Sequence, residues 1–176
     1  MYKPASLRAH LTAATPDLKT NPEKLTVFVK DGRLACAFGP TLSFEYRYTL
    51  SLVVLDYSGH PDAIMVPLLA WLKRHQVEVF ESPELRDKSV RFEVEYLNKD
   101  TIDLTIDIDL TERVLVKPGT QPNAEITARR YDVTHPGEPA HVGIVTEPER
   151  WELVVHGEVI AVWDFQPNPD DTWPTT

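Results

Sequence analysis

The sequence predicts an α+β protein: a mixed or antiparallel β-sheet flanked by two helices, then an extended C-terminal arm that ends in a small β-hairpin. Three observations predict this class: two stretches of helical spacing, several runs of strict two-residue alternation, and a concentration of prolines after residue 117. The 176 residues suffice for one domain with a sizeable core. We therefore predict a folded domain over residues 1–116, a proline-rich arm over 117–150, a β-hairpin over 151–164 and a flexible tail over 165–176.

The composition excludes several function classes. Its 18 lysines and arginines against 27 aspartates and glutamates give a net charge of −9, which argues against nucleic-acid binding because phosphates are bound with surplus positive charge. The single cysteine, Cys36, excludes an internal disulfide framework, argues against a cysteine-rich zinc site and fits a reducing cytosol. No apolar run approaches the roughly 20 residues that span a bilayer, and no signal-peptide stretch is present, so no membrane association is expected. The seven glycines are not spaced to hold a phosphate, and no cofactor is expected.

The first element is predicted to be a helix. Pro4 suits a first helical turn, and one face of the helix carries Leu7, Leu11, Ala14 and Leu18. Pro16 should kink or restart this helix, with Thr15 as a possible cap, and Asn21-Pro22 should end it.

Residues 25–38 are predicted to form a β-hairpin. Asp31-Gly32 favours a two-residue type I′ turn, which would pair Val29 with Leu34, Val27 with Cys36, and Leu25 with Phe38. Cys36 is then a buried small hydrophobe rather than a nucleophile, because no basic partner or helix N-terminus is in view to lower the pKa of its thiol.

The next elements are a strand, a helix and a short strand. The longest strand of the chain is expected over residues 42–55, where apolar and polar residues alternate. A second helix should end near Gln76, with Pro67 at its regular start or at a kink and a core stripe of Ile64, Leu68, Leu69, Trp71 and Leu72. A short strand is expected over residues 77–80.

Two further alternating strands, over residues 90–96 and 102–110, carry the most suggestive chemistry. A three-residue loop over 98–100 would pair Tyr96 with Ile102 and place one set of side chains on the face opposite the core: Arg91, Glu93, Glu95, Asp103, Thr105, Asp107 and Asp109. Glu95 would then oppose Asp103, a like-charge pair that costs stability in a simple fold. This face can be a solvated strand face, a metal site or an electronegative surface.

No catalytic centre can be assembled from the residues. Asp107-x-Asp109 is similar to the acidic pair that holds a divalent cation in some sugar transferases, but it lies within a regular strand without a nucleotide-binding loop. His135 and His141 lie in the proline-rich arm, which is a poor place for a preorganised metal site. We expect no metal and no enzymatic activity.

The C-terminal patch reads as two strands joined at His156-Gly157, a pair that fits a tight turn with both residues at positive φ. One predicted face carries Trp151, Leu153, Val155, Ile160 and Val162, and the other carries Val154, Val159 and Trp163. A hairpin that is apolar on both faces must be covered, so it packs on its own domain, on a neighbouring subunit or on a different protein.

A family resemblance runs over most of the chain in one order. It is carried by Lys3-Pro4, Ser6-Leu7-Arg8, Leu18-Lys19-Thr20-Asn21-Pro22, Leu42-Ser43-Phe44-Glu45, Arg47-Tyr48-Thr49-Leu50, Val66-Pro67, Leu69-Ala70-Trp71-Leu72, Leu110-Thr111-Glu112-Arg113, Glu152-Leu153, Gly157-Glu158 and Trp163-Asp164. The chain resembles the tail completion protein R family of contractile-tailed phages of the Peduovirus type. Pro16 and His156 depart from the family pattern, and residues 118–150 match nothing in it.

The resemblance implies a structural virion protein that finishes the tail and makes it competent to join the head. Related tail terminators have a β-sheet flanked by helices and assemble as a hexameric ring on the head-proximal end of the tail tube. The implied partners are further copies of this chain, the tail tube protein, and a sheath or head-side neck protein. DNA would pass through the lumen without specific binding. The implied location is the virion tail, with the host cytoplasm during assembly.

In such a ring the acidic strand face has a purpose, because an electronegative wall repels phosphates. We expect Glu93, Glu95, Asp103 and Asp107 to approach the lumen, and the arm and hairpin to bind a neighbour. Two alternatives stay open: a monomeric α+β protein-binding module, and a metal-dependent transferase that uses Asp107 and Asp109.

Overall fold

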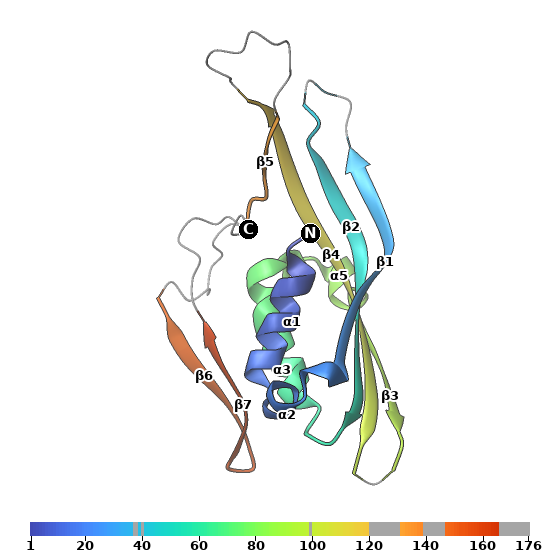
Figure 1. Ribbon diagram of the computed structural model, residues 1–176, viewed down its shortest axis with the longest axis vertical. Helices are drawn as coiled ribbons and strands as arrows, with labels where there is room; N and C mark the ends of the chain where they lie inside the picture. The colour runs from blue at the N-terminus through green and yellow to red at the C-terminus, as the bar shows by residue number, and fades with distance from the viewer. Residues whose placement is uncertain (37–38, 40, 99, 120–130, 139–146, 166–176) are drawn as a thin grey trace.

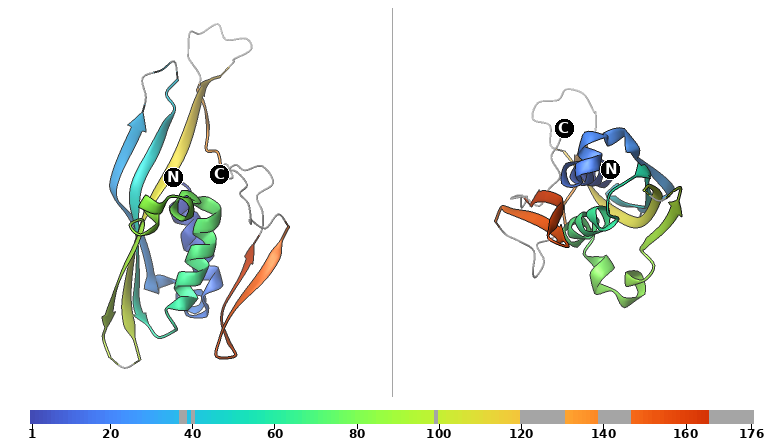
Figure 2. Two further views of the ribbon diagram at one scale, coloured as in Figure 1. Left: turned by 180° about the vertical axis from the view of Figure 1, so that it is seen from behind. Right: turned by 90° about the horizontal axis from the view of Figure 1, so that it is seen from below.

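The computed structural model has three layers: a curled antiparallel sheet, a pair of helices packed on one face of it, and a β-hairpin on the far side of the helices (Figures 1 and 2). It describes residues 1–36, 39, 41–98, 100–119, 131–138 and 147–165. The predicted α+β class, with helices against an antiparallel sheet and a C-terminal hairpin, is confirmed.

The helices of the described chain are α1 (Lys3–Ala14), α2 (Pro16–Thr20), α3 (Asp62–His75), α4 (Glu78–Glu81) and α5 (Pro83–Arg86), with a 3₁₀ turn η1 (Pro22–Lys24). Its strands are β1 (Leu25–Cys36), β2 (Phe44–Tyr57), β3 (Val90–Tyr96), β4 (Ile102–Pro118), β5 (Tyr131–Thr134), β6 (Glu149–Val155) and β7 (Glu158–Phe165). The sheet has the order β1-β2-β4-β3, and β5 pairs with the end of β4. β6 and β7 form the separate hairpin.

The main core lies between the sheet and the helices α1 and α3. Alternate residues of β2 and β4 point into it. The two strands pair with Leu50 opposite Ile108 and Leu52 opposite Ile106, so these apolar side chains share the helix-side face. Leu7 and Leu11 of α1, with Ile64, Leu68 and Leu72 of α3, close the core from the helical side. Strict alternation in the strands and helical spacing in α1 and α3 therefore converge on one buried layer.

The break at Pro16 confirms that the first helix restarts. α1 ends at Ala14 and α2 begins at Pro16, where a missing N–H costs nothing. Thr15 occupies the N-cap position, but its side chain makes no cap hydrogen bond. The buried Thr15 hydroxyl instead donates to the backbone carbonyl of Ala63 at 2.9 Å, tying this break to α3.

The predicted hairpin over residues 25–38 is wrong within the described residues. β1 continues through Asp31-Gly32 and pairs along its whole length with β2, from Leu25 opposite Val54 to Cys36 opposite Phe44. The two residues form a bulge, with Asp31 at φ 54°, because a strand already lies beside both halves of β1 and competes with a local turn. Phe38 lies outside the described residues.

Cys36 is exposed, which corrects the prediction that it is buried. It keeps the face predicted for it, but β1, β2 and β4 extend beyond the helices (Figure 1), so no described helix covers this end of the sheet. β4, with 17 residues, is the longest described strand. The strand predicted to be the longest, over residues 42–55, corresponds to β2 with 14 residues.

The segment predicted as a strand over residues 77–80 is helical in α4, with the backbone N–H of Phe80 donating to the carbonyl of Val77 at 2.8 Å. Periodicity cannot separate a strand from a helical turn over four residues. The predicted core stripe of the second helix includes Leu69, but this residue is exposed. Ile64, Leu68 and Leu72 face the sheet while Ala63, Val66 and Ala70 face the hairpin, which leaves Leu69 on the side between. Pro67 lies inside α3.

The hairpin turn at His156-Gly157 is confirmed, with φ of 51° and 87°. The predicted faces are wrong: Trp163 pairs opposite Trp151 and shares its face, together with Leu153 and Ala161. A bulge between Leu153 and Val154 places an extra residue on β7, and this reverses the alternation beyond it.

The segment predicted as an arm is strand at both of its described ends. β4 runs to Pro118, and β5 returns beside it with Val133 opposite Val116. The domain boundaries proposed from the sequence remain predictions, and residues 166–176 of the predicted tail lie outside the described residues.

Candidate interaction surfaces

The outer face of the sheet, opposite the helices, carries the predicted acidic cluster. β3 and β4 pair with Tyr96 opposite Ile102 and Glu95 opposite Asp103, as predicted. This register places Glu93, Glu95, Asp103 and Asp107 on the outer face, with Asp109 next in line; these five residues are the acidic end of the face.

Within the acidic end, the carboxylates of Asp107 and Asp109 are held by cations. Asp107 accepts hydrogen bonds from Lys30 at 2.8 Å and from Ser51 at 2.7 Å. Asp109 pairs with Arg91 at 2.8 Å and accepts from the Thr49 hydroxyl at 2.8 Å. Partial burial acts to raise the pKa of Asp107, but its hydrogen bonds from Lys30 and Ser51 outweigh this and hold that pKa below its usual value. The hydrogen bond from Arg91 likewise lowers the pKa of Asp109.

The opposite end of the same face is basic. Because β1 continues through Asp31-Gly32 and β4 continues to Pro118, the outward positions of β1, β2 and β4 extend past the acidic end and carry Arg33, Arg47, Arg113 and Lys117. Two acidic residues lie among them: Glu45, which pairs with Arg47 at 2.6 Å, and Asp132 of β5, which lies opposite Lys117. The outer face is therefore polarised along the strands, acidic near the β3–β4 turn and basic at the far end.

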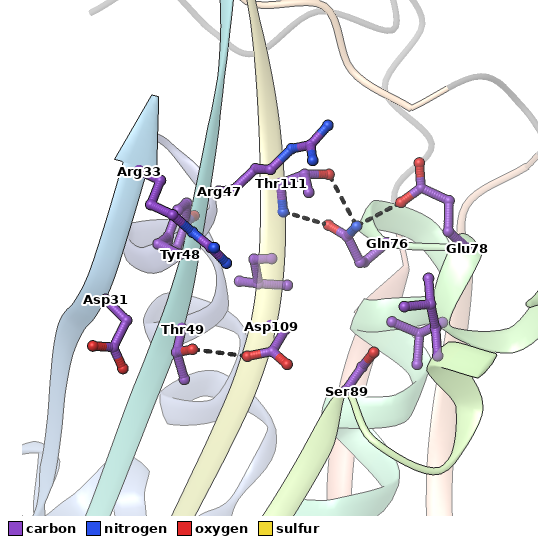
Figure 3. A pocket seen from close by; sticks show the side chains of 13 residues that line it. Asp31, Arg33, Arg47, Tyr48, Thr49, Gln76, Glu78, Ser89, Asp109 and Thr111 are labelled. Atoms are coloured by element: carbon purple, nitrogen blue, oxygen red, sulfur yellow. Dashed lines mark hydrogen bonds between the residues drawn. The ribbon is translucent and has the colours of Figure 1, made fainter. Parts of the chain in front are cut away.

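A pocket of about 250 Å³ lies beside the stretch of β4 that β3 does not reach. Its walls come from β1, β2, β4 and the α4–α5 segment, and Figure 3 shows Gln76 and Glu78 facing Thr111 across it. The Gln76 side chain accepts from the Thr111 backbone N–H at 3.1 Å and donates to the Thr111 hydroxyl at 3.1 Å, so it caps this free stretch of strand. The described residues that line the pocket include no histidine and no cysteine, and they contain no nucleophile paired with a base.

A buried polar cluster joins the N-terminus to the sheet and to the end of α3. Glu112 is buried and accepts hydrogen bonds from the Tyr2 backbone N–H at 2.7 Å and from the Tyr48 hydroxyl. The ammonium of the buried Lys3 donates to Gln76 Oε1 at 2.7 Å and to the carbonyl of His75. Lys3 also pairs at 3.2 Å with Glu138, which belongs to the predicted arm. Burial lowers the pKa of Lys3 and raises that of Tyr48. The cluster is structural, since it fastens the N-terminus, the sheet, the end of α3 and the predicted arm to one another.

His75 makes the stability of this region sensitive to acid. Its ring packs on Trp71 at 4.6 Å, and burial, together with the charge of Lys3, lowers the pKa of His75 to about 3. In the unfolded chain the His75 imidazole takes up a proton below a pH of about 6.5, whereas in the folded chain it stays neutral until a pH of about 3. The stabilisation is therefore complete above pH 6.5 and is lost as the pH falls. We expect this group to contribute a slope of up to about 1.4 kcal/mol per pH unit in that window.

The measurement is the urea-unfolding free energy at pH 7 and pH 5. His75→Phe, which preserves the packing on Trp71, should lose less stability over this interval than the wild type. His60→Phe is the matched control, because the His60 side chain is 48% exposed. Equal losses in the wild type and in His75→Phe would contradict the assignment.

The C-terminal hairpin packs on the helices of its own chain. Trp163 and Ala161 of β7 are buried with Ala14 of α1 and Ala63 of α3. Leu153 and Ile160 pack against the same cluster, and the Trp151 ring packs at a tilt against Trp163, with 5.9 Å between the ring centroids. Of the six predicted interface residues, Trp163, Leu153 and Ile160 are thus engaged within the chain, Val155 and Val162 are partly buried, and Trp151 is exposed. Val154 and Val159, which are not among the six, are also exposed.

The two arm histidines are not brought together by the described structure. His135 packs edge-on against Tyr2 at 4.7 Å, and burial lowers its pKa. His141 lies outside the described residues. Among the residues that the structure describes, no group of three His, Cys, Asp or Glu is placed to hold a metal.

No helix in the described part of the chain is long and apolar enough to cross a membrane. The described residues thus form an α+β protein with helices on one face of an antiparallel sheet, a charged outer face, and two sheet edges that no described strand covers. In the comparisons with known proteins, the family model for P2 phage tail completion protein R (GpR) matches residues 1–139. Tail completion protein R of Escherichia phage P2 is 38% identical over 164 residues, which cover 93% of this chain and 99% of that relative. No solved structure matches the chain.

The chain belongs to the P2 phage tail completion protein R family. It is a structural protein of the bacteriophage tail and hence of the virion.

Proposed function

We propose that this chain completes the head-proximal end of the contractile tail tube as a hexameric ring at the neck, and so prepares the tail for joining to the head. Its partners are then further copies of itself, the tail tube protein, and a sheath or head-side neck protein. Assembly takes place in the host cytoplasm. The observation that carries this proposal is the family membership, which covers nearly the whole chain.

In such a ring the acidic end of the outer face is the candidate lumen wall. Glu93, Glu95 and Asp103 form ion pairs with none of the described residues, whereas Lys30 neutralises Asp107. Asp103 lies on the inner strand β4, so its charge would remain even where the edge residues Glu93 and Glu95 contact a neighbouring copy, and it would repel passing DNA without binding it. A ring structure that placed these residues on the outside would contradict this assignment.

A second candidate, the monomeric protein-binding module, is favoured by one observation. The hairpin folds back and buries Trp163 on its own helices, so one face of this apolar hairpin is covered without a neighbour. The transferase alternative has no such support, because Lys30 and Arg91 hold the carboxylates of Asp107 and Asp109.

Light scattering of the purified protein over a wide concentration range, with negative-stain images of the same sample, separates the two candidates. A species near six subunits with a central hole supports the ring. A monomer throughout, together with failure of the wild-type chain to restore infectious particles to a phage lacking its own tail completion protein, would overturn the tail-ring proposal.

The exposed side of the hairpin is the candidate contact to a neighbour in the tail. We expect Val159→Asp to leave the unfolding free energy within about 0.5 kcal/mol of the wild type, since Val159 is half exposed, but to reduce the yield of infectious particles. Leu69→Asp, an equally exposed apolar position on α3, is the matched control. Normal particle yield with Val159→Asp would show that this side of the hairpin stays free.

A further inference from the structure

The two lateral edges of the sheet are strands without a partner among the described residues. β1 forms one edge and β3 the other. Each strand runs antiparallel to the next across β1, β2, β4 and β3, so β1 and β3 run in opposite directions. When two copies face the same way, β1 of one copy can therefore meet β3 of the next as a further antiparallel pair.

The side chains on the two edges are complementary in charge. On the outer face, β1 carries Lys30 and Arg33, while β3 carries Glu93 and Glu95. Arg33 and both glutamates are exposed and form ion pairs with none of the described residues. Lys30 holds Asp107 from its own chain, but its side chain remains 40% exposed.

The same edges are complementary on the helix-side face. β1 carries Val29 and Leu34, and Leu34 is 62% exposed. β3 carries Phe92, which is 62% exposed, and Tyr96, which is 79% exposed. Exposed apolar residues on an unpaired strand edge favour association with another strand.

We propose that β1 of one copy pairs with β3 of the next copy, in the register that sets Lys30 opposite Glu95 and Arg33 opposite Glu93. This pairing rests on the self-association proposed above. The two bulge residues, Asp31 and Gly32, together oppose a single residue of β2. In the proposed register they would likewise oppose a single residue of β3, Val94. The helix-side pairs in this register are Val29 with Tyr96 and Leu34 with Phe92.

Neighbouring registers do not achieve this match. A shift of one residue would place the apolar side chains of one edge on the polar face of the other. A shift of two residues in one direction opposes Arg33 to Arg91, and a shift of two in the other leaves Lys30 beyond the end of β3. Only the proposed register joins both cations to both glutamates.

The charges also select how copies are arranged. Pairing of β1 with β1, or of β3 with β3, in a two-fold dimer would bring like charges together. The β1-to-β3 contact is heterologous, so it repeats from copy to copy until a ring closes. This symmetry makes a charge-swap experiment decisive.

Arg33→Glu and Glu93→Arg should each weaken self-association roughly tenfold or more, measured by sedimentation velocity, because each places like charges across every contact. Mixed in equal amounts, the two variants should assemble again as an alternating ring. At one kind of contact, the glutamate introduced at position 33 meets the arginine introduced at position 93. At the other kind, the unchanged Arg33 meets the unchanged Glu93. Lys73→Glu on α3 and Glu84→Arg on α5 are matched controls at exposed sites and should assemble like the wild type.

The same variants are tested for restoring infectious particles to a phage that lacks its tail completion protein, which also reports assembly that occurs only on the tube. Failure of each single variant and rescue by their co-expression support the edge pairing. If the wild type restores particles, either of two results would show that the edge pairing is wrong while the tail role stands. The first is that the single variants restore particles as well as the wild type does, and the second is that the co-expressed variants fail to restore them. If the wild type itself fails, the proposed function is wrong.

Discussion

Replacing Trp163 with alanine is expected to lower the free energy of unfolding by about 3–5 kcal/mol and to detach the C-terminal hairpin. Trp163 is 5% exposed and forms the buried centre of the contact between β7 and the helices α1 and α3. Its loss leaves small side chains, Ala14, Ala63 and Ala161, around a cavity that they cannot fill. Urea unfolding measures the loss.

The location of the loss can be measured separately. In Trp163→Ala, amide hydrogens of β6 and β7 should exchange early while those of β2 and β4 stay protected, because the main core lies on the other side of the helices. Trp151→Ala is the control: Trp151 occupies the paired position on the same face but is 40% exposed, so about 1 kcal/mol is expected. Equal losses for the two variants would contradict docking through Trp163.

Glu112→Gln is expected to lower the free energy of unfolding by about 3 kcal/mol at neutral pH. The carboxylate accepts from two donors, the Tyr2 backbone N–H and the Tyr48 hydroxyl, and it lies near the buried ammonium of Lys3. An amide supplies one acceptor and one donor group, so the Tyr2 N–H keeps its acceptor only if the Tyr48 hydroxyl turns from donor to acceptor, and both hydrogen bonds lose the charge of the carboxylate. Lys3 also loses a compensating charge.

A double-mutant cycle with Lys3→Met separates these two effects. If the charges are coupled, the double variant loses less stability than the sum of the single variants. Glu152→Gln, at an exposed position of the hairpin, is the control and should change stability by less than about 0.5 kcal/mol. A loss below about 1 kcal/mol for Glu112→Gln would show that the cluster does not fasten the N-terminus to the sheet.

The local patterns of the chain predicted most of its elements. The alternation around Leu104 and Ile106, the helical spacing of Leu7 and Leu11, and the turn at His156-Gly157 all match the structure. The register of β3 with β4 followed from parity together with a three-residue loop over 98–100, because a one-residue slip would have exposed every apolar side chain.

The errors share one physical origin, competition between a local signal and a distant partner. Asp31-Gly32 is a strong turn signal, yet β2 lies beside both halves of β1 and the pair becomes a bulge. Leu69 is apolar at helical spacing, but the hairpin and the sheet occupy the two faces beside it. Glu112 gave no signal in the sequence, because its partners Tyr2 and Tyr48 are distant in the chain.

Residue order and local spacing were enough to predict the α+β class, the acidic strand face, the C-terminal hairpin and the family of this protein, since each depends on residues close together in the chain or on their order along it. Three features became visible only in the folded chain: the hairpin covers its own helices, the outer face has a basic end as well as an acidic one, and β1 and β3 are the free edges of the sheet. These features arise from the pairing of segments far apart in the chain, which depends on their combined burial and which no local pattern encodes.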